Sequence, residues 1–560
     1  MARSIRILVI SLFLLLGWKE RVQAQASSTG SGAERIEHAP VFGVDWVAPG
    51  DFGDAAGDLV EIAEVGFTAV RMPPVYDQDF FTLADTLGLT LYIELPYTHL
   101  PSRSLSRALE ASDSLLTMVL NAGAGHRSAG PIGITRLSDT RSSQACDAIE
   151  MIAHRIRAAG RMAYYTTLFA DGDQCTDRVD FVLVDRLRPY GDMDQLQEVM
   201  RREASSQTTR MGLAGVGSSV SEGEETGWSV PGSEEAQARF METALKALLG
   251  SQLSHVFIHR WRDQAEGDTS VPDPWQRSYG LYAIDSEPRP SLQVVRGMLR
   301  GFQDTFAFSE GQPDEHERPW FPVMGWIMIG LTALMYAGSP RFRNMIPRYF
   351  FAHGFFRNAV REAREVLPLT STAILTVTGL SIGLIGSFII TGLQDLALTV
   401  HWYRLLDEST RASVTAILNV PFVLTVLIGS MTLVSTSVWM GGWMALTGRR
   451  ARLLPSQALM LASWPRWQVL ILLPLAMTLQ ATAGIPLWSI ILLAVGWVAT
   501  AIWATIRTTY DLYKIIRVAP GTAVVAWVLH PLVLGMLAAT GWALLNWEHV
   551  RFAWYLLTAV

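Results

Sequence analysis

The sequence predicts an α/β (β/α)8 TIM barrel ectodomain followed by an all-α polytopic transmembrane helical domain. Near the N-terminus, short β-rich segments recur about every 25 residues with amphipathic runs between them, which is typical of repeated β/α units. From Trp320 onward, long apolar runs dominate. The 560 residues exceed one domain, and a hydrophobic fraction of 50% with a mean hydropathy of +0.24 is high for a wholly soluble protein.

Residues 1–26 have the pattern of a secretory signal peptide. Arg3 and Arg6 precede an apolar run of about 12 residues, which is short for a membrane span, and the small-residue exit Val22-Gln23-Ala24 follows. The alternative is an uncleaved anchor. Either interpretation exports the domain that follows the flexible, Ser- and Gly-containing leader at 27–40.

Eight β-rich segments are expected to form the barrel, which we place at 41–305. They lie at 41–47, 66–73, 88–97, 131–139, 161–168, 179–187, 209–217 and 253–261. A doubly wound sheet would show the same alternation of strands and helices. Eight strands in about 220 residues match the count and length of one (β/α)8 barrel, so the count favours the barrel.

An acidic, Pro-containing linker at 306–319 separates the barrel from a membrane domain at 320–560. Six membrane spans are expected, at 320–337, 368–391, 412–440, 467–483, 485–506 and 521–546. The run at 412–440 is overlong and the fourth and fifth runs are tightly joined, so five or seven spans stay open.

The distribution of charge predicts the orientation. Three connections between spans are rich in basic residues, and the alternate connection at 393–411 carries Asp395, Asp407 and Glu408 against two arginines. By the positive-inside rule, the basic connections are cytoplasmic and the barrel is periplasmic or extracellular, on a bacterial inner or plasma membrane. The basic segment 340–364 is either an amphipathic helix on anionic lipid or an ordinary loop that sets topology.

Composition limits the other classes of function. A net charge of −6 gives no reason to expect nucleic acid as a partner. No His, Asp or Glu cluster has metal-ligand spacing, and we expect no cofactor. The two cysteines, Cys146 and Cys175, follow neighbouring predicted strands in an exported domain, which favours a disulfide over two free thiols.

Candidate binding residues lie where the predicted strands end, because barrels of this class work at the carboxyl ends of their strands. These residues are Asp45, Trp46, Arg71, Glu94, Asp185, His259, Trp261 and Asp263. Charged groups bind sugar hydroxyls and aromatic surface suits sugar faces, although barrels that process phosphates or amino acids use the same residues. Structural roles also compete: Arg71 could pair with Glu94, and His259 could be a hydrogen-bonded rim residue. Trp261 could be either a sugar platform or a plug in the rim.

The order of several motifs resembles the family 2 and related clan A glycoside hydrolases. The sequences GFTAVRMPPVY and GLTLYIELPY resemble the second and third barrel strands of that family, where an arginine and then an acidic residue with proline end the strands. The sequences SEEAQARFMETALKAL, HRWRD and GLYAIDSEPRPSLQVV resemble the closing part of the barrel. The resemblance covers about residues 41–302 and implies a carbohydrate ligand.

Two departures from that family concern the catalytic positions. Retaining members carry an acid/base glutamate in an Asn-Glu pair after strand 4 and a nucleophilic glutamate after strand 7. Here the first place reads Arg136-Leu137-Ser138-Asp139, and Gly215 occupies the expected nucleophile position. A retaining enzyme needs two carboxyl groups about 5 to 5.5 Å apart, and an inverting enzyme about 6.5 to 9.5 Å. Asp139 or Glu94 could serve as an acid, and Asp185 or the loop acids Glu222, Glu224 and Glu225 could be recruited.

The sequence therefore favours a degenerate, glycosidase-like barrel that binds carbohydrate without hydrolysis, in envelope polysaccharide handling or sensing. One alternative is an active glycoside hydrolase that cleaves O-glycosyl bonds with relocated carboxylates. Another is a membrane assembly or scaffold protein whose barrel binds protein. The expected partners are a carbohydrate ligand and the lipid bilayer, with a membrane-protein partner left open.

Overall fold

The structure is a computed structural model. It describes residues 40–49, 52–168, 173–185, 191–205, 211–221, 226–263, 278–311, 320–394, 396–418, 420–451, 453–482 and 486–558. These residues belong to one compact unit, Ala39–Val560. The predicted signal peptide, nearly all of the leader and residues 312–319 of the predicted linker lie outside the described residues.

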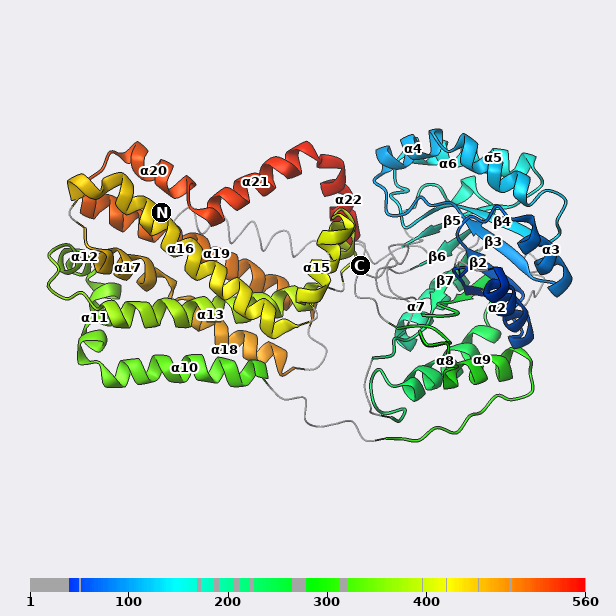
Figure 1. The fold of residues 1–560 in the computed structure, drawn as a ribbon, viewed down its shortest axis with the longest axis horizontal. Helices are drawn as coiled ribbons and strands as arrows, with labels where there is room; N and C mark the ends of the chain where they lie inside the picture. Colours follow the sequence, from blue (N-terminus) through cyan, green and yellow to red (C-terminus); the bar gives the residue numbers. More distant parts are fainter. Residues whose placement is uncertain are drawn as a thin grey trace. The chain divides into compact units, whose positions relative to one another are not determined.

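The N-terminal part is a closed barrel of eight parallel strands, as the sequence predicts (Figure 1). The strands follow chain order around the barrel, and the barrel closes where Val41 of the first strand pairs with His255 of the last. The strands are β1 (Val41–Asp45), β2 (Ala69–Met72), β3 (Thr90–Glu94), β4 (Ala129–Arg136), β5 (Ala163–Thr167), β6 (Phe181–Val184), β7 (Met211–Val216) and β8 (His255–Ile258).

Helices cover the outside of the barrel because each has one apolar face. In α2, for example, Ala55, Leu59 and Ile62 recur at helical spacing and are fully buried. The helices of this part are α2 (Phe52–Val65), α3 (Gln78–Leu87), α4 (Ser102–Glu110), α5 (Asp113–Ala122), α6 (Ser143–Ala158), η1 (Thr176–Arg178), α7 (Met193–Ser205), α8 (Glu234–Leu249) and α9 (Pro290–Leu299).

Aromatic side chains fill the inside of the barrel. Tyr164 stacks on Phe181 with ring centroids 5.0 Å apart, and Phe257 contacts Tyr92 at 5.1 Å. At Gly43 in β1, a Cβ atom would overlap the Phe257 ring, so the small residue makes room for that ring. The interior is therefore a packed core, and ligand access is confined to the strand ends.

The C-terminal part is helical. Its helices are α10 (Trp320–Gly338), α11 (Pro340–Phe351), α12 (His353–Arg361), α13 (Pro368–Leu393), α14 (Ala397–Arg404), α15 (Glu408–Leu418), α16 (Pro421–Ala451), α17 (Pro455–Ser463), η2 (Trp464–Arg466), α18 (Val469–Gln480), α19 (Leu487–Ile516), α20 (Pro520–Val528), α21 (Pro531–Leu545) and α22 (Trp547–Thr558).

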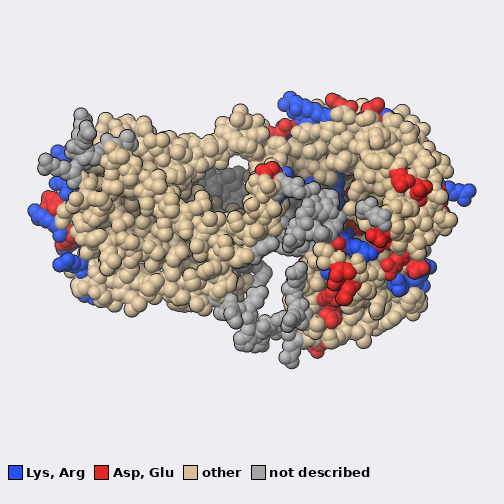
Figure 2. All heavy atoms as spheres, in the orientation of Figure 1, with Lys and Arg blue, Asp and Glu red and all other residues tan. Residues whose placement is uncertain are grey.

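Five helices of the described chain are long and apolar enough to cross a membrane: Trp320–Gly338, Pro368–Leu393, Pro421–Ala445, Pro455–Gln480 and Leu487–Ile516. Helices α20 and α21 together make a sixth candidate, although they are bent by 71°. Figure 2 shows that the visible face of this part is largely free of Lys, Arg, Asp and Glu, and that its charged groups gather at the end where α12 lies.

Four predicted spans differ in their bounds from the structure. The fourth, predicted at 467–483, is Pro455–Gln480, and the fifth, predicted at 485–506, is Leu487–Ile516. The predicted start at residue 412 is wrong, because 412–418 belong to the separate helix α15, and Pro421 begins α16. The predicted span 521–546 is interrupted at His530, where Pro531 starts a new helix. Proline lacks the amide hydrogen that a continuous helix needs, so both breaks have the same physical cause.

A cationic pocket at the carboxyl end of the barrel

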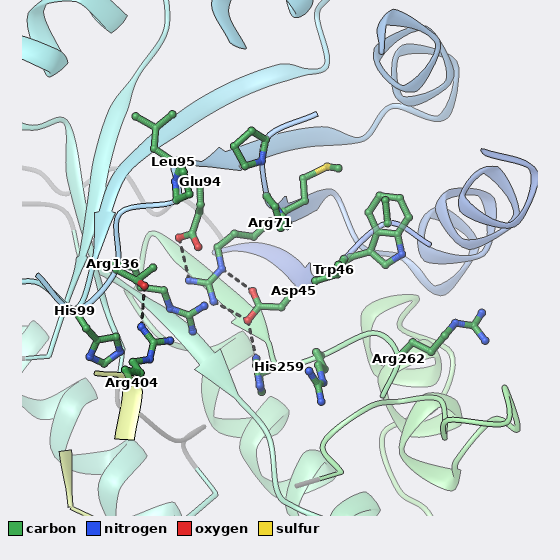
Figure 3. Close-up of a pocket in the computed structure, with 18 of the residues that line it drawn as sticks. Asp45, Trp46, Arg71, Glu94, Leu95, His99, Arg136, His259, Arg262 and Arg404 are labelled. Atoms are coloured by element: carbon green, nitrogen blue, oxygen red, sulfur yellow. Dashed lines mark hydrogen bonds and ion pairs between the residues drawn. The ribbon is translucent and has the colours of Figure 1, made fainter. Parts of the chain in front are cut away.

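A pocket of about 780 Å³ lies at the strand ends, within the usual range for small-ligand sites. Residues at the ends of β1, β2, β3, β4 and β8 line it together with residues of α14, α15 and α22 (Figure 3). Its carboxylates are Asp45, Asp58, Glu94 and Asp263. Its basic residues are Arg71, Arg136, Arg260, Arg262, Arg404 and Arg411, joined by His99, His259, His401 and His549.

Asp45 and Arg71 form a buried bidentate ion pair. Arg71 Nε donates to Asp45 Oδ1 at 2.5 Å, and Arg71 Nη2 donates to Asp45 Oδ2 at 2.6 Å. His259 Nδ1 lies 2.8 Å from the same Oδ2, and Arg71 Nη2 also donates to the Ala214 carbonyl. Burial alone would raise the pKa of Asp45, but Arg71 and His259 together lower it below the usual range. Asp45 is therefore a fixed anion that orients Arg71.

Glu94 is held less tightly than Asp45. Its carboxylate lies 3.6 Å from Arg71 Nη1, which is longer than a hydrogen bond, and its side chain is 17% exposed. The hydroxyls of Tyr164 and Thr166 donate to Glu94 Oε1 at 3.4 Å each. The expected pairing of Arg71 with a neighbouring carboxylate therefore involves Asp45 first and Glu94 second. Figure 3 shows Glu94 directed toward Arg71 from the end of β3.

The other two pocket carboxylates hold the rim together. Asp58 accepts from Trp46 Nε1 at 2.9 Å and from Arg262 Nη2 at 2.5 Å. Asp263 accepts from the backbone amides of Tyr279 and Gly280 and pairs with Arg289 at 2.7 Å. Each of these carboxylates is thus engaged by an arginine and by at least one further protein donor.

Three predicted site residues lie outside the pocket lining. Asp139 pairs with Arg141 at 3.0 Å, and Asp185 pairs with Arg136 at 2.6 Å. Trp261 is 0% exposed and contacts Phe67 and Tyr282, so its burial fits the second of its two expected roles, a plug, and not the sugar platform. Its residue type predicts a platform, but its burial makes it a core residue. Trp46 does line the pocket, but only 3% of it is exposed.

The expected nucleophile position carries no charged side chain, because it is Gly215. A Cβ atom at Gly215 would lie 3.5 Å from Asp185 Oδ1 and 3.6 Å from His259 Cβ, which are ordinary van der Waals distances. Glu222, Glu224 and Glu225 lie outside the described residues. Among the carboxylates of the described pocket lining, only Glu94 has no arginine nitrogen within 3 Å.

Sequence reasoning missed the residues that α14 and α15 contribute. Arg404 Nη1 donates to Thr98 Oγ1 at 2.7 Å, a contact between residues 306 positions apart (Figure 3). His99 is buried in a left-handed backbone conformation with φ of 55°. The one signal in the sequence was that Arg404 and Arg411 interrupt the acidic connection at 393–411.

Cys146 at the start of α6 and Cys175 before η1 form a disulfide in the structure. Both cysteines are buried. Among the described residues, no group of three or more His, Cys, Asp or Glu side chains could hold a metal ion.

Comparison with known proteins gives weak matches to glycosidase structures. No protein-family model matches the sequence, and no curated protein matches it. A GH2 β-galacturonidase from Eisenbergiella tayi bound to galacturonate is 17% identical, with 48% of this chain and 52% of that chain covered and a TM-score of 0.41. A β-glucuronidase from Ruminococcus gnavus in complex with D-glucaro-d-lactam is 14% identical, with 47% and 49% covered and a TM-score of 0.40. The chain spans about half the length of these structures.

Proposed function

We propose that this chain is a membrane-tethered, extracytoplasmic protein whose degenerate, glycosidase-like barrel binds carbohydrate without hydrolysing it, in envelope polysaccharide handling or sensing. One observation carries the proposal. Asp45, Asp58 and Asp263 each contact an arginine within 2.7 Å, which leaves Glu94 as the least constrained carboxylate of the described pocket lining.

Glycoside hydrolysis requires two carboxyl groups in complementary roles. One protonates the leaving oxygen, and the other attacks the anomeric carbon or activates water. Asp45 cannot supply the proton because its pKa is lowered, and its oxygens are already occupied by Arg71 and His259. Glu94 can fill one role, and Gly215 offers no partner. A pocket with polar groups and one loosely held carboxylate is suited to recognition.

The membrane arrangement that we propose has the barrel at 41–305, the membrane domain at 320–560 and an N-terminal signal peptide at 1–26. The pocket lining supports a barrel on the outer side. It includes Arg404 and Arg411 from the acidic connection, the one that the positive-inside rule assigns to that side.

The second candidate is an active glycoside hydrolase with relocated carboxylates. Glu94 favours it, because this residue faces the pocket and retains solvent access. Such an enzyme would need its second carboxyl group from a loop beyond the described residues.

The test uses the full chain purified in detergent micelles. Binding of envelope oligosaccharides is measured by calorimetry, and turnover is measured with a panel of aryl glycosides. The proposal expects binding without turnover, both for the wild type and for Glu94→Gln. Turnover that disappears in Glu94→Gln would establish the hydrolase instead. If the chain shows neither binding nor turnover, both candidate functions are overturned, and a protein partner for the barrel is favoured.

A further inference from the structure

We propose that the saccharide bound in this pocket is anionic, and that Arg404 and Arg411 of the membrane part bind its carboxylate or phosphate group. This inference rests on the proposed function and specifies its ligand. It concerns the side of the pocket formed by α14 and α15, whereas the interactions at the barrel strand ends are those described above.

The first support is the balance of charge in the pocket lining. Among the described residues, six arginines and four carboxylates line the pocket. Three of the carboxylates are already engaged: Asp45 by Arg71, Asp58 by Arg262 and Asp263 by Arg289. Arg136 has its own partner in Asp185, which lies outside the lining. Arg260 lies 4.0 Å from Asp263, and the two lining arginines on the α14 and α15 side, Arg404 and Arg411, have no carboxylate partner among the described residues.

Arg404 and Arg411 carry that excess. Among the described residues, neither forms an ion pair, and the one side-chain hydrogen bond of Arg404 goes to the neutral hydroxyl of Thr98. Arg411 Nε is buried without a hydrogen-bond partner. Burial and the nearby Arg136 and Arg411 lower the pKa of Arg404 to about 9. Cations left unpaired in a partly buried site are costly, and an anionic ligand would offset that cost.

His99 supplies a second, independent observation on the same side of the pocket. It is 4% exposed, it lines the pocket, and neither of its ring nitrogens has a hydrogen-bond partner. Burial, followed by repulsion from Arg404 and His401, lowers the pKa of His99 well below its usual value, so the ring is neutral and can donate one N–H. Figure 3 shows His99 beside Arg404.

The chemistry of these donors selects an oxyanion over a neutral sugar. A guanidinium presents a planar fork of N–H groups that matches carboxylate and phosphate oxygens. A neutral sugar would leave both guanidiniums without a counter-charge. Among the described lining residues, no aromatic platform for a neutral sugar face is exposed, because Trp46 is nearly buried, and Trp261 is wholly buried outside the lining.

The experiment compares three probes that differ at carbon 6: glucose, glucuronate and glucose 6-phosphate. Inorganic phosphate is the fourth probe. Each is titrated into the full chain in detergent micelles by calorimetry, for the wild type and for Arg404→Gln/Arg411→Gln. The matched control is Arg551→Gln, which removes an exposed arginine of α22 that does not line the pocket. Loss of a charge-assisted hydrogen bond should weaken binding about tenfold or more.

The expected result is that glucuronate or glucose 6-phosphate binds at least tenfold more tightly than glucose, by the above estimate. The double variant should abolish that preference, and Arg551→Gln should keep it. The acidic sugar that binds more tightly identifies the anion as carboxylate or phosphate.

Equal binding of all three sugars would overturn this inference and leave carbohydrate binding intact. Phosphate binding that depends on both arginines, without any sugar binding, would support the anion site and overturn the proposed function. A preference unchanged in the double variant, or no binding by any probe, would overturn the inference.

Discussion

At the scale of single residues, the buried Asp45–Arg71–His259 network fixes the floor of the pocket. Removing one partner of a buried ion pair leaves an uncompensated charge, which costs about 3 to 5 kcal/mol. Asp45→Asn should therefore lower the thermal midpoint of the barrel, measured by intrinsic fluorescence. Asp113→Asn is the matched control, because the exposed pair of Asp113 with Arg155 is worth about 1 kcal/mol or less. Equal midpoints in the two variants would contradict the structural role of Asp45.

The lowered pKa of Asp45 also predicts a pH dependence. The pKa of the carboxyl is about 3.9 in the unfolded chain, and it is lower in the folded protein. Between these two values the unfolded state binds more protons, so the stability from this group is complete above the unfolded pKa and is lost as pH falls through the folded pKa. The stability difference between wild type and Asp45→Asn should therefore shrink below pH of about 4. A difference that is constant from pH 7 to pH 3 would contradict this.

At the scale of elements, α13 packs closely against α16 because a glycine lies at the crossing. A Cβ atom at Gly383 would clash with the backbone carbonyl of Thr425, whereas nothing lies within 4 Å of a Cβ atom at Gly541 in α21. We expect Gly383→Leu to reduce the yield of monodisperse protein on size exclusion, since overpacking costs about 1 to 3 kcal/mol or more. Gly541→Leu should behave like the wild type, and similar loss in both would show that the crossing is not tight.

The elements also show what could be predicted from the sequence. Parallel strands buried on both faces are continuous apolar runs, as in residues 181–184, so all eight strands were recognisable. For the pocket, the sequence predicted the residues at the strand ends but not those of the C-terminal helices. Asp45, Arg71 and Glu94 follow from strand-end positions, but the contact of Arg404 with Thr98 joins two distant parts of the chain, and local pattern contains no information about such a contact. The choice between the two expected roles of Trp261 stayed open for the same reason, because its burial depends on Phe67 and Tyr282.

At the scale of the whole molecule, the proposed function requires the barrel, α14 and α15 to face the same compartment. The positive-inside rule assigns the connection at 393–411 to the outer side and the basic segment 340–364 to the cytoplasm. The described chain has no free cysteine, so single new cysteines report accessibility cleanly. Ser413→Cys in α15 and Gly354→Cys in α12 both lie at exposed positions and form a matched pair.

We expect an impermeant maleimide to label Ser413→Cys in intact spheroplasts, because α15 contributes to the outward-facing pocket. Gly354→Cys should be labelled only after the membrane is permeabilised, because the arginines around it favour the cytoplasmic side. Labelling of both positions in permeabilised membranes controls for exposure. If Gly354→Cys alone is labelled in intact spheroplasts, the topology is the inverse of the one that we expect. The pocket would then face the cytoplasm, where an envelope polysaccharide could not reach it, and the proposed function would fail with the topology.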